Sequence, residues 1–424
     1  MRHFDRLQDI ARDTSGNIML LSAFSLTALV GAAGLATDTV QWTLWKRQLQ
    51  READSAATAG AMTNYQGGSA YIAAATEIGR MNLVTLTSPA AVEVGPTSGP
   101  YTGNHNAVRV VLQTSVRLPF SSFFLHTPPV VRAEATAAAV TIGTYCVISF
   151  DNTVSTGITF QGSSTTNLGC GVATNAQGST AVYAGGSSTV TASPVAAVGG
   201  VPTSNNYATG TVYQPYSMAQ TDPLSSLPTP SLPNCSGQLS VSPNQTRNIN
   251  NSGGVSCYRG MDLKGTVNFA PGIYYIDGGS INVGSQATIT GSGVTFIFTS
   301  STADTNPASI ATLNINGGAT LNLTAPGSGT YASVLFYQDR RALHSSNGNS
   351  TTNFVTGNSS SILQGSVYFP QQSVQFTGNT GMNTNCVNIY AWDVTFTGNS
   401  AISNVCPSNS GMQPVSGVQV RLVS

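Results

Sequence analysis

The chain has 424 residues, and its 16 basic and 16 acidic side chains give a formal net charge of zero. A chain without net charge has no overall attraction for nucleic acid or for an acidic membrane face, so neither is favoured as a partner. Beyond residue 150 only six basic side chains occur, and Gly, Ser, Thr and Asn alternate there with Val, Ile and Phe. This pattern is typical of short strands joined by polar turns rather than of a disordered linker.

The first predicted element is an apolar run over residues 18–40. An uninterrupted helix rises about 1.5 Å per residue, so this run would be roughly 34 Å long and could cross a bilayer core. Residues 1–17 form a short stub, which we expect to be cytoplasmic because the cysteines further along the chain favour export of the remainder. The sequence therefore predicts a single-pass membrane protein.

A cleaved signal peptide is the alternative interpretation of this run, with small residues at Gly34 and Ala36 as the cleavage signal. We favour an uncleaved anchor because the run is longer than the core of a signal peptide. In addition, Trp42 and Trp45 follow it, where amphipathic indole rings favour the membrane interface.

Two features inside the run are candidate contacts with partners. Small residues recur at four-residue spacing, as in Ala23, Thr27 and Gly31, which permits close approach of another helix but also suits an anchor that is simply rich in small residues. Asp38 lies near the outer end of the run, where it can pair with a partner subunit or reach the interface beside Lys46. The sequence leaves both pairs of alternatives open.

Residues 41–143 are predicted to form a small α+β module next to the membrane. The helix is expected to continue outward to about Ala61, because residues 48–61 are rich in alanine and contain no proline. A second helix is expected over residues 70–84. Strands are expected over residues 107–112 and 130–135, on either side of a proline pair.

Three segments of this N-terminal third together resemble a known family. They are the start R-D-T-S-G-N at residues 12–17, the pair Gly34 and Asp38, and the helix L-Q-R-E-A-D-S-A-A-T-A-G-A at residues 49–61. Residues 12–61 are thereby similar to the Tad domain that opens TadG-type proteins of the tight-adherence (Flp) pilus system. The resemblance implies a role in pilus assembly at a bacterial inner membrane, with pilus-assembly or pseudopilin proteins as partners.

The distal part, residues 144–424, contains an internal repeat. The sequence V-x-F-T-G-N occurs at residues 374–379 and again 20 residues later at 394–399, and a third copy begins at Ile158. A second unit, L-x-G-x-V-x-F, occurs at residues 263–269 and 363–369. A period near 20 with alternating apolar residues and a turn glycine predicts a β-solenoid resembling a parallel β-helix, with a β-sandwich as the alternative. The expected fold class is therefore mainly β.

All six cysteines lie beyond the apolar run, none forms a C-x-x-C pair, and the four histidines are scattered, so we expect disulfides and no metal site. An even number of cysteines suits an oxidising compartment such as the periplasm or the cell exterior. Cysteines at equivalent phase in the repeat are expected to pair equivalently. The predicted disulfides are Cys146–Cys170, Cys386–Cys406 and, by exclusion, Cys235–Cys257.

We expect no catalytic residues and no cofactor. The distal part contains no glutamate and no paired acids, although a glycosidase normally needs two carboxylates. Its only dense charge cluster is Asp339, Arg340 and Arg341, which can bind a sugar acid or a partner carboxylate, or form a salt bridge within a loop. A polysaccharide hydrolase or lyase on a β-helix is therefore the least favoured of three hypotheses.

The favoured hypothesis is a non-enzymatic, membrane-anchored component of a pilus-assembly system that displays a periplasmic or surface β domain. A surface adhesin, whose polar Ser, Thr and Asn faces contact glycans or a host surface, is the alternative.

Overall fold

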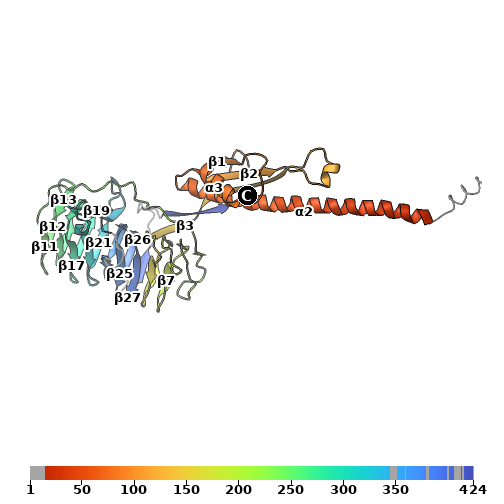
Figure 1. Cartoon of the computed structure of the whole chain (residues 1–424). Coiled ribbons are helices and arrows are strands. Elements are labelled where there is room, and N and C mark those ends of the chain that lie inside the picture. Colours follow the sequence, from red (N-terminus) through yellow and green to blue (C-terminus); the bar gives the residue numbers. More distant parts are fainter. Residues whose placement is uncertain are drawn as a thin grey trace, which may run out of the picture. The chain divides into compact units, whose positions relative to one another are not determined.

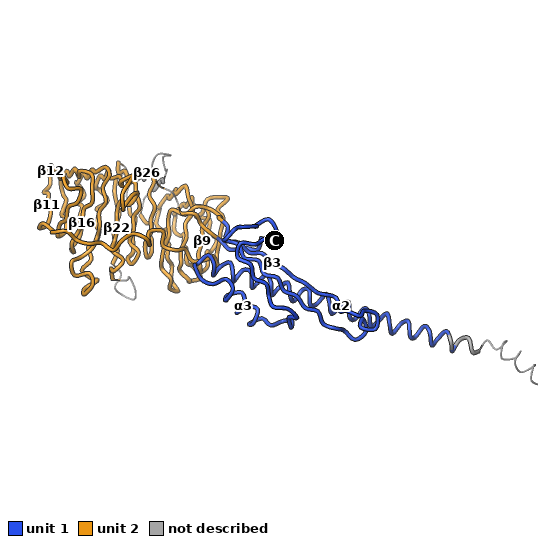
Figure 2. Tube along the Cα trace, turned by 90° about the horizontal axis from the view of Figure 1, so that it is seen from above, with its two compact units in different colours: residues 1–140, 419–424 blue, residues 141–418 orange. Residues whose placement is uncertain are grey.

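The computed structural model describes residues 15–343, 351–358, 360–378, 382–398, 401–404, 412 and 415–423. The chain forms two compact units, which are coloured separately in Figure 2. Unit 1 comprises residues 1–140 and 419–424, and unit 2 comprises residues 141–418. Residues 419–424 group with unit 1, although the sequence places them in the distal domain. Unit 2 is thus an insertion in unit 1.

Unit 1 is organised around α2 (Ser15–Tyr65), a continuous helix of 51 residues (Figure 1). The predicted continuation of the apolar run as a helix is confirmed, and the helix ends four residues beyond Ala61. Alanine has the highest intrinsic helix propensity, and the segment contains no proline to interrupt the backbone hydrogen bonds.

The second helix, α3 (Ala70–Met81), begins at Ser69, whose side-chain oxygen accepts a hydrogen bond from the backbone N–H of Ile72. It ends at Asn82, which has a left-handed backbone with φ of 40°. Asparagine is one of the few residues that adopt this conformation readily, and it commonly stops a helix. The helix therefore ends before Val84, where the sequence predicts its end.

Three antiparallel strands complete unit 1: β1 (Ala91–Val94), β2 (Ala107–Thr114) and the first part of β3 (Val131–Ser149). Side chains alternate between the two faces of a strand, and one face of β2 and β3 is buried. That face packs on the alanine-rich side of α2 in a core that includes Leu49, Ala53 and Ala57. A short C-terminal strand, β29 (Val415–Leu422), is followed by Val423, whose N–H donates to the carbonyl of Thr136.

Two features of unit 1 differ from the prediction. The sequence does not indicate β1, which is only four residues long. It also predicts an end of β3 at residue 135, whereas β3 continues to Ser149 and its last residues belong to unit 2. Tyr145 and residues 147–149 pair with strands of unit 2, which is why the strand extends beyond its local sequence signal.

Unit 2 is a stack of coils whose strands form three parallel ladders. The parallel register confirms the expected β-helix-like architecture and shows that the sandwich alternative is wrong, because sandwich strands are antiparallel. In spatial order the first ladder contains β11 (Leu239–Val241), β14 (Met261–Leu263), β17 (Ser280–Val283), β20 (Thr312–Ile315), β23 (Thr352–Thr356), β25 (Ser373–Gly378), β27 (Val394–Gly398), β4 (Ile158–Phe160) and β7 (Val182–Ala184).

The second and third ladders complete the coils. The second ladder contains β12 (Thr246–Ile249), β15 (Thr266–Phe269), β18 (Thr288–Ser292), β21 (Thr320–Thr324), the first part of β24 (Ile362–Phe369), the first part of β26 (Met382–Ala391), β28 (Ala401–Asn404), β5 (Thr165–Asn167) and β8 (Thr189–Thr191). The third contains β13 (Val255–Tyr258), β16 (Gly272–Asp277), β19 (Val294–Thr299), β22 (Val334–Gln338), the second parts of β24 and β26, the end of β3, β6 (Gly171–Thr174), β9 (Val195–Ala197) and β10 (Tyr213–Gln214).

The order of the coils in space differs from their order in the chain. The chain enters unit 2 through β3 in the middle of the stack and winds toward β10 at one end. Residues 215–238, which we call the strap, then lead to β11 at the other end. From there the chain winds back until β26, β27 and β28 pair with β3, β4 and β5. Figure 1 shows β11 and β7 at opposite ends of this stack, with β25 and β27 between them.

The three copies of the V-x-F repeat lie on neighbouring coils at this closing contact. Phe396 stacks on Phe376 at a ring-centroid distance of 5.5 Å and on Phe160 at 5.0 Å. The turn glycines Gly398 and Gly162 also stack, and both have positive φ angles. A Cβ atom on Gly162 would lie 3.0 Å from the backbone N of Gly398, so the coils approach closely there. The copies at 374, 394 and 158 are therefore adjacent, although Asn379 and Asn399 lie outside the described residues.

The second repeated unit is not stacked in this way. Residues 263–269 connect the first ladder to the second, whereas residues 363–369 connect the second ladder to the third. Both stretches share a glycine at the corner, Gly265 and Gly365, at which a Cβ would approach other atoms to less than 3 Å. The two corners differ in backbone conformation, because Gly365 has a φ of 139° whereas Gly265 has no positive φ, so the recurring sequence occupies two different positions of the coil.

Candidate membrane-interface site

The apolar part of α2 presents its side chains outward. The helix contains a segment that is long and apolar enough to cross a membrane. Large exposed apolar surface on a soluble protein is rare and marks contact with a membrane or a partner. The exposed large side chains along it are Met19, Leu21, Phe24, Leu26, Leu29, Val30, Leu35, Val40 and Leu44.

Gly34 and Asp38 interrupt this exposed surface with a buried patch. The connection between β2 and β3 contains the 3₁₀ turn η1 (Ser121–Phe123), and its residues lie against α2 at this patch. A Cβ atom on Gly34 would lie 2.1 Å from Cδ1 of Phe120, so any larger residue would displace that ring. Asp38 is only 3 % exposed, and its Oδ2 accepts a hydrogen bond of 2.6 Å from the backbone N–H of Ser121.

These contacts give Asp38 a partner within its own chain. Lys46, beside which the sequence places Asp38, instead donates its Nζ to the carbonyl of Arg132 at 2.5 Å. Gly31 is different from Gly34, because a Cβ atom there would meet no described atom within 4 Å. Of the small residues in the run, Gly34 is thus the one that accommodates another segment of this chain.

The loop held by this patch is unusually apolar. We call residues 120–125 the aromatic loop. Phe123 is 84 % exposed and Phe124 is 66 % exposed. Phe120 and Leu125 are 38 % and 42 % exposed. None of the elements expected from the sequence includes this loop. A cluster of three phenylalanines and two leucines at residues 118–125, in a segment without strand alternation, was the available signal.

The two tryptophans have different environments. Trp45 is half-buried and packs against the core of unit 1, which limits its role at a membrane interface. Trp42 is half-buried too, and its indole Nε1 is buried without a hydrogen-bond partner among the described residues. The two tryptophans are thus partly buried in the protein rather than fully available to the membrane interface.

The alanine-rich part of α2 serves close packing. Ala53, Ala56 and Ala57 are fully buried, and a Cβ atom on Gly60 would lie 3.1 Å from Cγ1 of Val108. Glu52, which the sequence analysis overlooked, is also fully buried and accepts a 2.6 Å hydrogen bond from the N–H of Leu83. Small side chains at these positions allow the sheet and α3 to approach the helix.

An ion pair between Arg80 and Glu77 links the last two turns of α3. Arg80 donates two hydrogen bonds to the carboxylate of Glu77, and Ser55 donates a third. These bonds, chiefly those from Arg80, lower the pKa of Glu77 from 4.5 to about 2.

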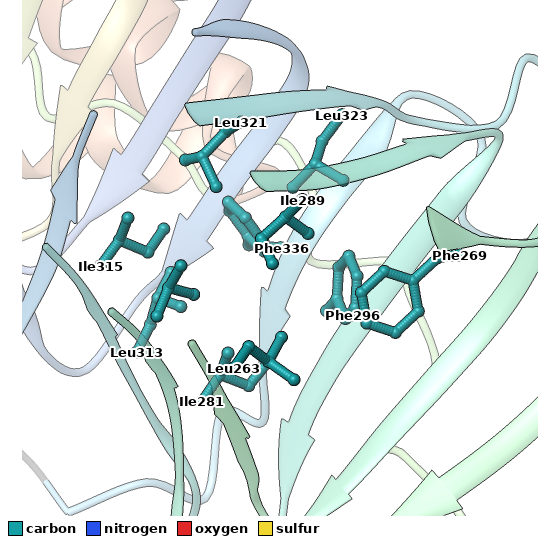
Figure 3. A pocket seen from close by; sticks show the side chains of 11 residues that line it. Leu263, Phe269, Ile281, Ile289, Phe296, Leu313, Ile315, Leu321, Leu323 and Phe336 are labelled. Carbon is teal, nitrogen blue, oxygen red and sulfur yellow. The ribbon is translucent and has the colours of Figure 1, made fainter. Parts of the chain in front are cut away.

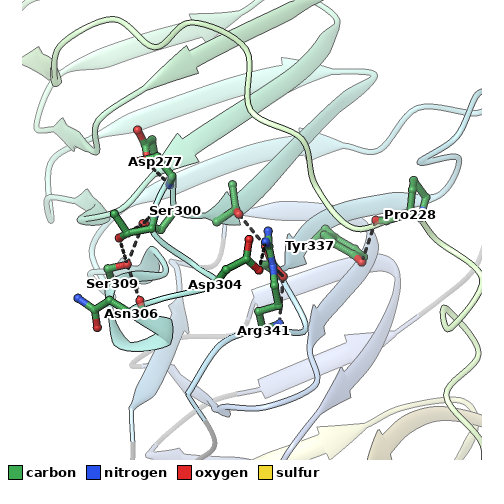
Figure 4. Close-up of polar contacts among 12 residues, drawn as sticks. Pro228, Asp277, Ser300, Asp304, Asn306, Ser309, Tyr337 and Arg341 are labelled. Carbon is green, nitrogen blue, oxygen red and sulfur yellow. Dashed lines mark hydrogen bonds and ion pairs between the residues drawn. The ribbon is translucent and has the colours of Figure 1, made fainter.

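The charge cluster of the distal part is engaged inside unit 2. Arg341 forms ion pairs with Asp339 at 2.6 Å and with Asp304 at 2.7 Å (Figure 4). Asp339 is fully buried, and although burial alone would raise its pKa, hydrogen bonds from Arg341 and Thr299 keep that pKa below its usual value. The salt-bridge interpretation of this cluster therefore describes Arg341.

Arg340 instead holds the strap. It donates hydrogen bonds to the carbonyl oxygens of Leu224 and Leu227 and to the Tyr368 hydroxyl, which in turn donates to Asp222. Its guanidinium also lies 5.6 Å from the centre of the Tyr368 ring. The strap thereby covers the outer side of the third ladder, where Figure 4 also shows the contact between Tyr337 and Pro228.

The fold brings two acids together that are distant in the sequence. Asp151 follows β3 and Asp393 follows β26, on coils that pair with each other. Burial raises the pKa of Asp393, and the charge of Asp151 adds to this effect. The carboxylate of Asp393 accepts a hydrogen bond from Ser373, and that of Asp151 accepts bonds from Thr153 and Ser155. Hydroxyl and backbone donors within the coil corners thus satisfy both acids.

Unit 2 has a closed apolar interior and an open polar groove. Figure 3 shows leucine, isoleucine and phenylalanine side chains of the three ladders around an internal cavity of about 20 Å³, room for one water at most. A groove of about 330 Å³ lies on the outer side of the first ladder and is open to solvent. It is lined by Asn314, Ile315, Asn316, Gly317, Phe354, Thr356, Gln375 and Thr377.

Two of the predicted disulfides are present. Cys146 is bonded to Cys170, and Cys235 is bonded to Cys257. Cys386 is disulfide-bonded as well, but its expected partner Cys406 lies outside the described residues, so that pairing stays a prediction. No group of three or more His, Cys, Asp or Glu side chains that could hold a metal ion occurs in the part of the chain that the structure describes.

Comparison with known proteins agrees with this geometry in the N-terminal region. No curated protein and no solved structure matches the chain. The family model that matches, over residues 16–63, is Tad, described as putative Flp pilus-assembly TadE/G-like. The matched segment contains Gly34, Asp38 and the alanine-rich face of α2. Residues 16–63 of this chain are thus similar to the Tad family, and they lie on a helix that is long and apolar enough to anchor the protein in a membrane.

Proposed function

We propose that this protein is a non-enzymatic component of a tight-adherence (Flp-type) pilus assembly system. In this proposal residues 18–40 span the inner membrane, residues 1–17 lie in the cytoplasm, and unit 2 lies in the periplasm or at the cell surface. The match of residues 16–63 to the Tad family carries the proposal. The long exposed apolar surface of α2 supports the anchor, and the two disulfides of unit 2 suit an oxidising compartment.

The engagement of polar side chains supports a non-enzymatic role. Arg340 is held by carbonyls of the strap and Arg341 by the buried carboxylate of Asp339, so they are poorly placed to bind a substrate. Hydroxyl groups of the coil corners similarly engage Asp151 and Asp393.

Cross-linking in living cells tests this role. The full-length protein carries a photoreactive residue at exposed Leu26 or Leu29 in the apolar run, and cross-linked proteins are identified from the membrane fraction. We expect pilus-assembly or pseudopilin proteins to be captured there, and the same residue placed at exposed Tyr183 in unit 2 serves as a control for position. Recovery of the protein in the soluble fraction after alkaline extraction, with no such partners, would contradict the proposal.

A surface adhesin is the second candidate function, and the open groove of the first ladder favours it. The groove combines amide and hydroxyl groups with Phe354, whose ring is 37 % exposed. Aromatic rings and amide side chains are the groups that commonly contact sugar rings and their hydroxyls. Binding of the exported region to a glycan array, lost in Phe354→Ala and kept in Tyr183→Ala, would support this function. Equal signals from both variants would refute it.

A further inference from the structure

The aromatic loop touches the predicted membrane span rather than the part of α2 outside it. Its contacts with α2 are at Gly34 and Asp38, and the apolar run continues to Val40. At about 1.5 Å per residue, Gly34 lies roughly 9 Å before the end of the run. If residues 18–40 cross the bilayer, the loop therefore meets the helix at the depth of the outer leaflet. We propose that the aromatic loop inserts into the outer leaflet beside the span, as a second membrane contact of the same chain.

This inference rests on the membrane span of the proposed function. Its own support begins with the chemistry of the loop surface. The exposed side chains of the loop are Phe120, Phe123, Phe124 and Leu125, with only Ser122 between them as an exposed polar residue. Transfer of such a surface from water to an apolar phase is favourable in proportion to its area.

The backbone of the loop is already arranged for an apolar environment. A chain segment in lipid must satisfy its own hydrogen-bonding groups, because no water is available there. All five backbone N–H groups from Ser121 to Leu125 have acceptors within unit 1. Ser121 donates to Asp38, Ser122 to Leu118, Phe123 to Phe120, and both Phe124 and Leu125 donate to Ser121. The Ser122 hydroxyl donates to the carbonyl of Pro119 at 2.9 Å.

Asp38 and Gly34 act as positioning residues in this arrangement. The carboxylate of Asp38 is hidden from solvent and satisfies the first N–H of the turn, while Gly34 leaves room for the Phe120 ring. An acid inside a span is costly unless it has such a partner.

The two segments that flank the aromatic loop, at Arg117 and His126, form its neck. This neck suits the headgroup layer of a membrane. Arg117 is exposed, and its guanidinium donates to the carbonyl of His126 across the neck at 2.9 Å. A long basic side chain can place its charge among lipid headgroups while its stem lies along apolar surface. Basic residues at the neck and apolar residues at the tip thus follow the polarity gradient of a membrane interface.

The test places a fluorescent label at one of three positions in the full-length protein. The label is the environment-sensitive dye NBD on an introduced cysteine, attached without reduction so that the native disulfides remain. The protein is reconstituted in vesicles of phosphatidylethanolamine and phosphatidylglycerol. The three variants are Phe123→Cys in the aromatic loop, Leu29→Cys in the span, and Ile72→Cys on α3, which is 70 % exposed and serves as the aqueous control.

We expect lipid-borne nitroxide to quench the label at 123 several-fold more strongly than the label at 72, and aqueous Co²⁺ to quench it several-fold less. Combining Phe123→Cys with Gly34→Leu should displace the loop and reverse this pattern. Asp38→Leu should do the same, whereas Asp38→Asn keeps an oxygen acceptor for the Ser121 N–H and should preserve lipid quenching.

Three outcomes would overturn the proposal, and they are distinguishable. Lipid quenching at 29 together with aqueous quenching at 123 would leave the span intact and refute the loop insertion. A label at 123 that is shielded from both quenchers would show that a second copy of the chain or another protein covers the loop. Absence of lipid quenching at 29 would refute the span itself, and with it the loop insertion.

Discussion

Loss of the Arg340 side chain should release the strap from the third ladder. Arg340 supplies hydrogen bonds to two strap carbonyls, those of Leu224 and Leu227. It also lies against the Tyr337 and Tyr368 rings, with centroid distances of 5.8 and 5.6 Å. Arg340→Ala removes all of these contacts at once.

The size of the effect follows from the number and exposure of these contacts. Hydrogen bonds from a charged donor contribute about 1.5 to 3 kcal/mol each. The Arg340 side chain is 29 % exposed, so the low end of that range applies, and the two bonds to strap carbonyls give about 3 kcal/mol. We therefore expect strap attachment to weaken by about 3 kcal/mol.

Hydrogen exchange of the full-length protein measures this change directly. The amide of Leu224 is bonded to the Asp222 side chain and that of Leu227 to the Leu224 carbonyl, so both report on strap order. A loss of about 3 kcal/mol should accelerate their exchange roughly hundredfold in Arg340→Ala, because about 1.4 kcal/mol corresponds to a factor of ten.

The control is Lys264→Ala, which removes an exposed ion pair with Asp262 and should cost less than about 1 kcal/mol. Arg340→Lys should fall between the two, because lysine keeps the charge but cannot reach several acceptors with one planar group. Exchange in Arg340→Ala that equals exchange in Lys264→Ala would refute the reasoning.

Three further predictions concern unit cores and acid stability. Phe396→Ala should destabilise unit 2 by about 3 to 5 kcal/mol in urea unfolding, because this ring is fully buried. Phe354→Ala, at a partly exposed ring, should cost less than about 1 kcal/mol. Equal urea midpoints for the two variants would contradict the stacked-coil core. Cys235→Ser should lower stability by roughly 3 kcal/mol, and a reducing agent should then lower its melting temperature less than that of the wild type. The ion pair with Arg80 depresses the pKa of Glu77 to about 2, so its stabilisation is present above about pH 4.5 and is lost as the pH falls toward 2. The difference in melting temperature between wild type and Glu77→Gln should therefore shrink on acidification, and a difference independent of pH would refute this assignment.

The local pattern of the distal part was sufficient to predict the type of fold but not its winding. Alternating apolar residues and a turn glycine indicate a coil in any position of the stack, so Phe376, Phe396 and Phe160 were recognisable as equivalent. Which coil lies next to which depends on pairings between segments hundreds of residues apart, and those leave little trace in a local pattern. In the structure the copies at 158 and 394 pair directly with each other.

Of the two parts of the candidate site, the residues on α2 were predictable from the sequence and the aromatic loop was not. Gly34 and Asp38 stand out because a glycine and an acid are unusual near the outer end of an apolar run. Their partner, the aromatic loop, is more than 80 residues away and has no regular periodicity, so no pattern connects it to the helix. Glu52 was similarly hidden, because a glutamate in a helix normally faces solvent, whereas this one is buried against Leu83.

The discontinuous winding of unit 2 imposes an order on its completion. Synthesis runs from the N-terminus, so it produces β3, β4 and β5 about 230 residues before β26, β27 and β28, which pair with them. During that interval one edge of the early coils has unpaired backbone groups, which can pair with other chains. The last coils to be synthesised therefore seal the domain across its middle, and a chain truncated before β26 should be prone to self-association at that unfinished edge.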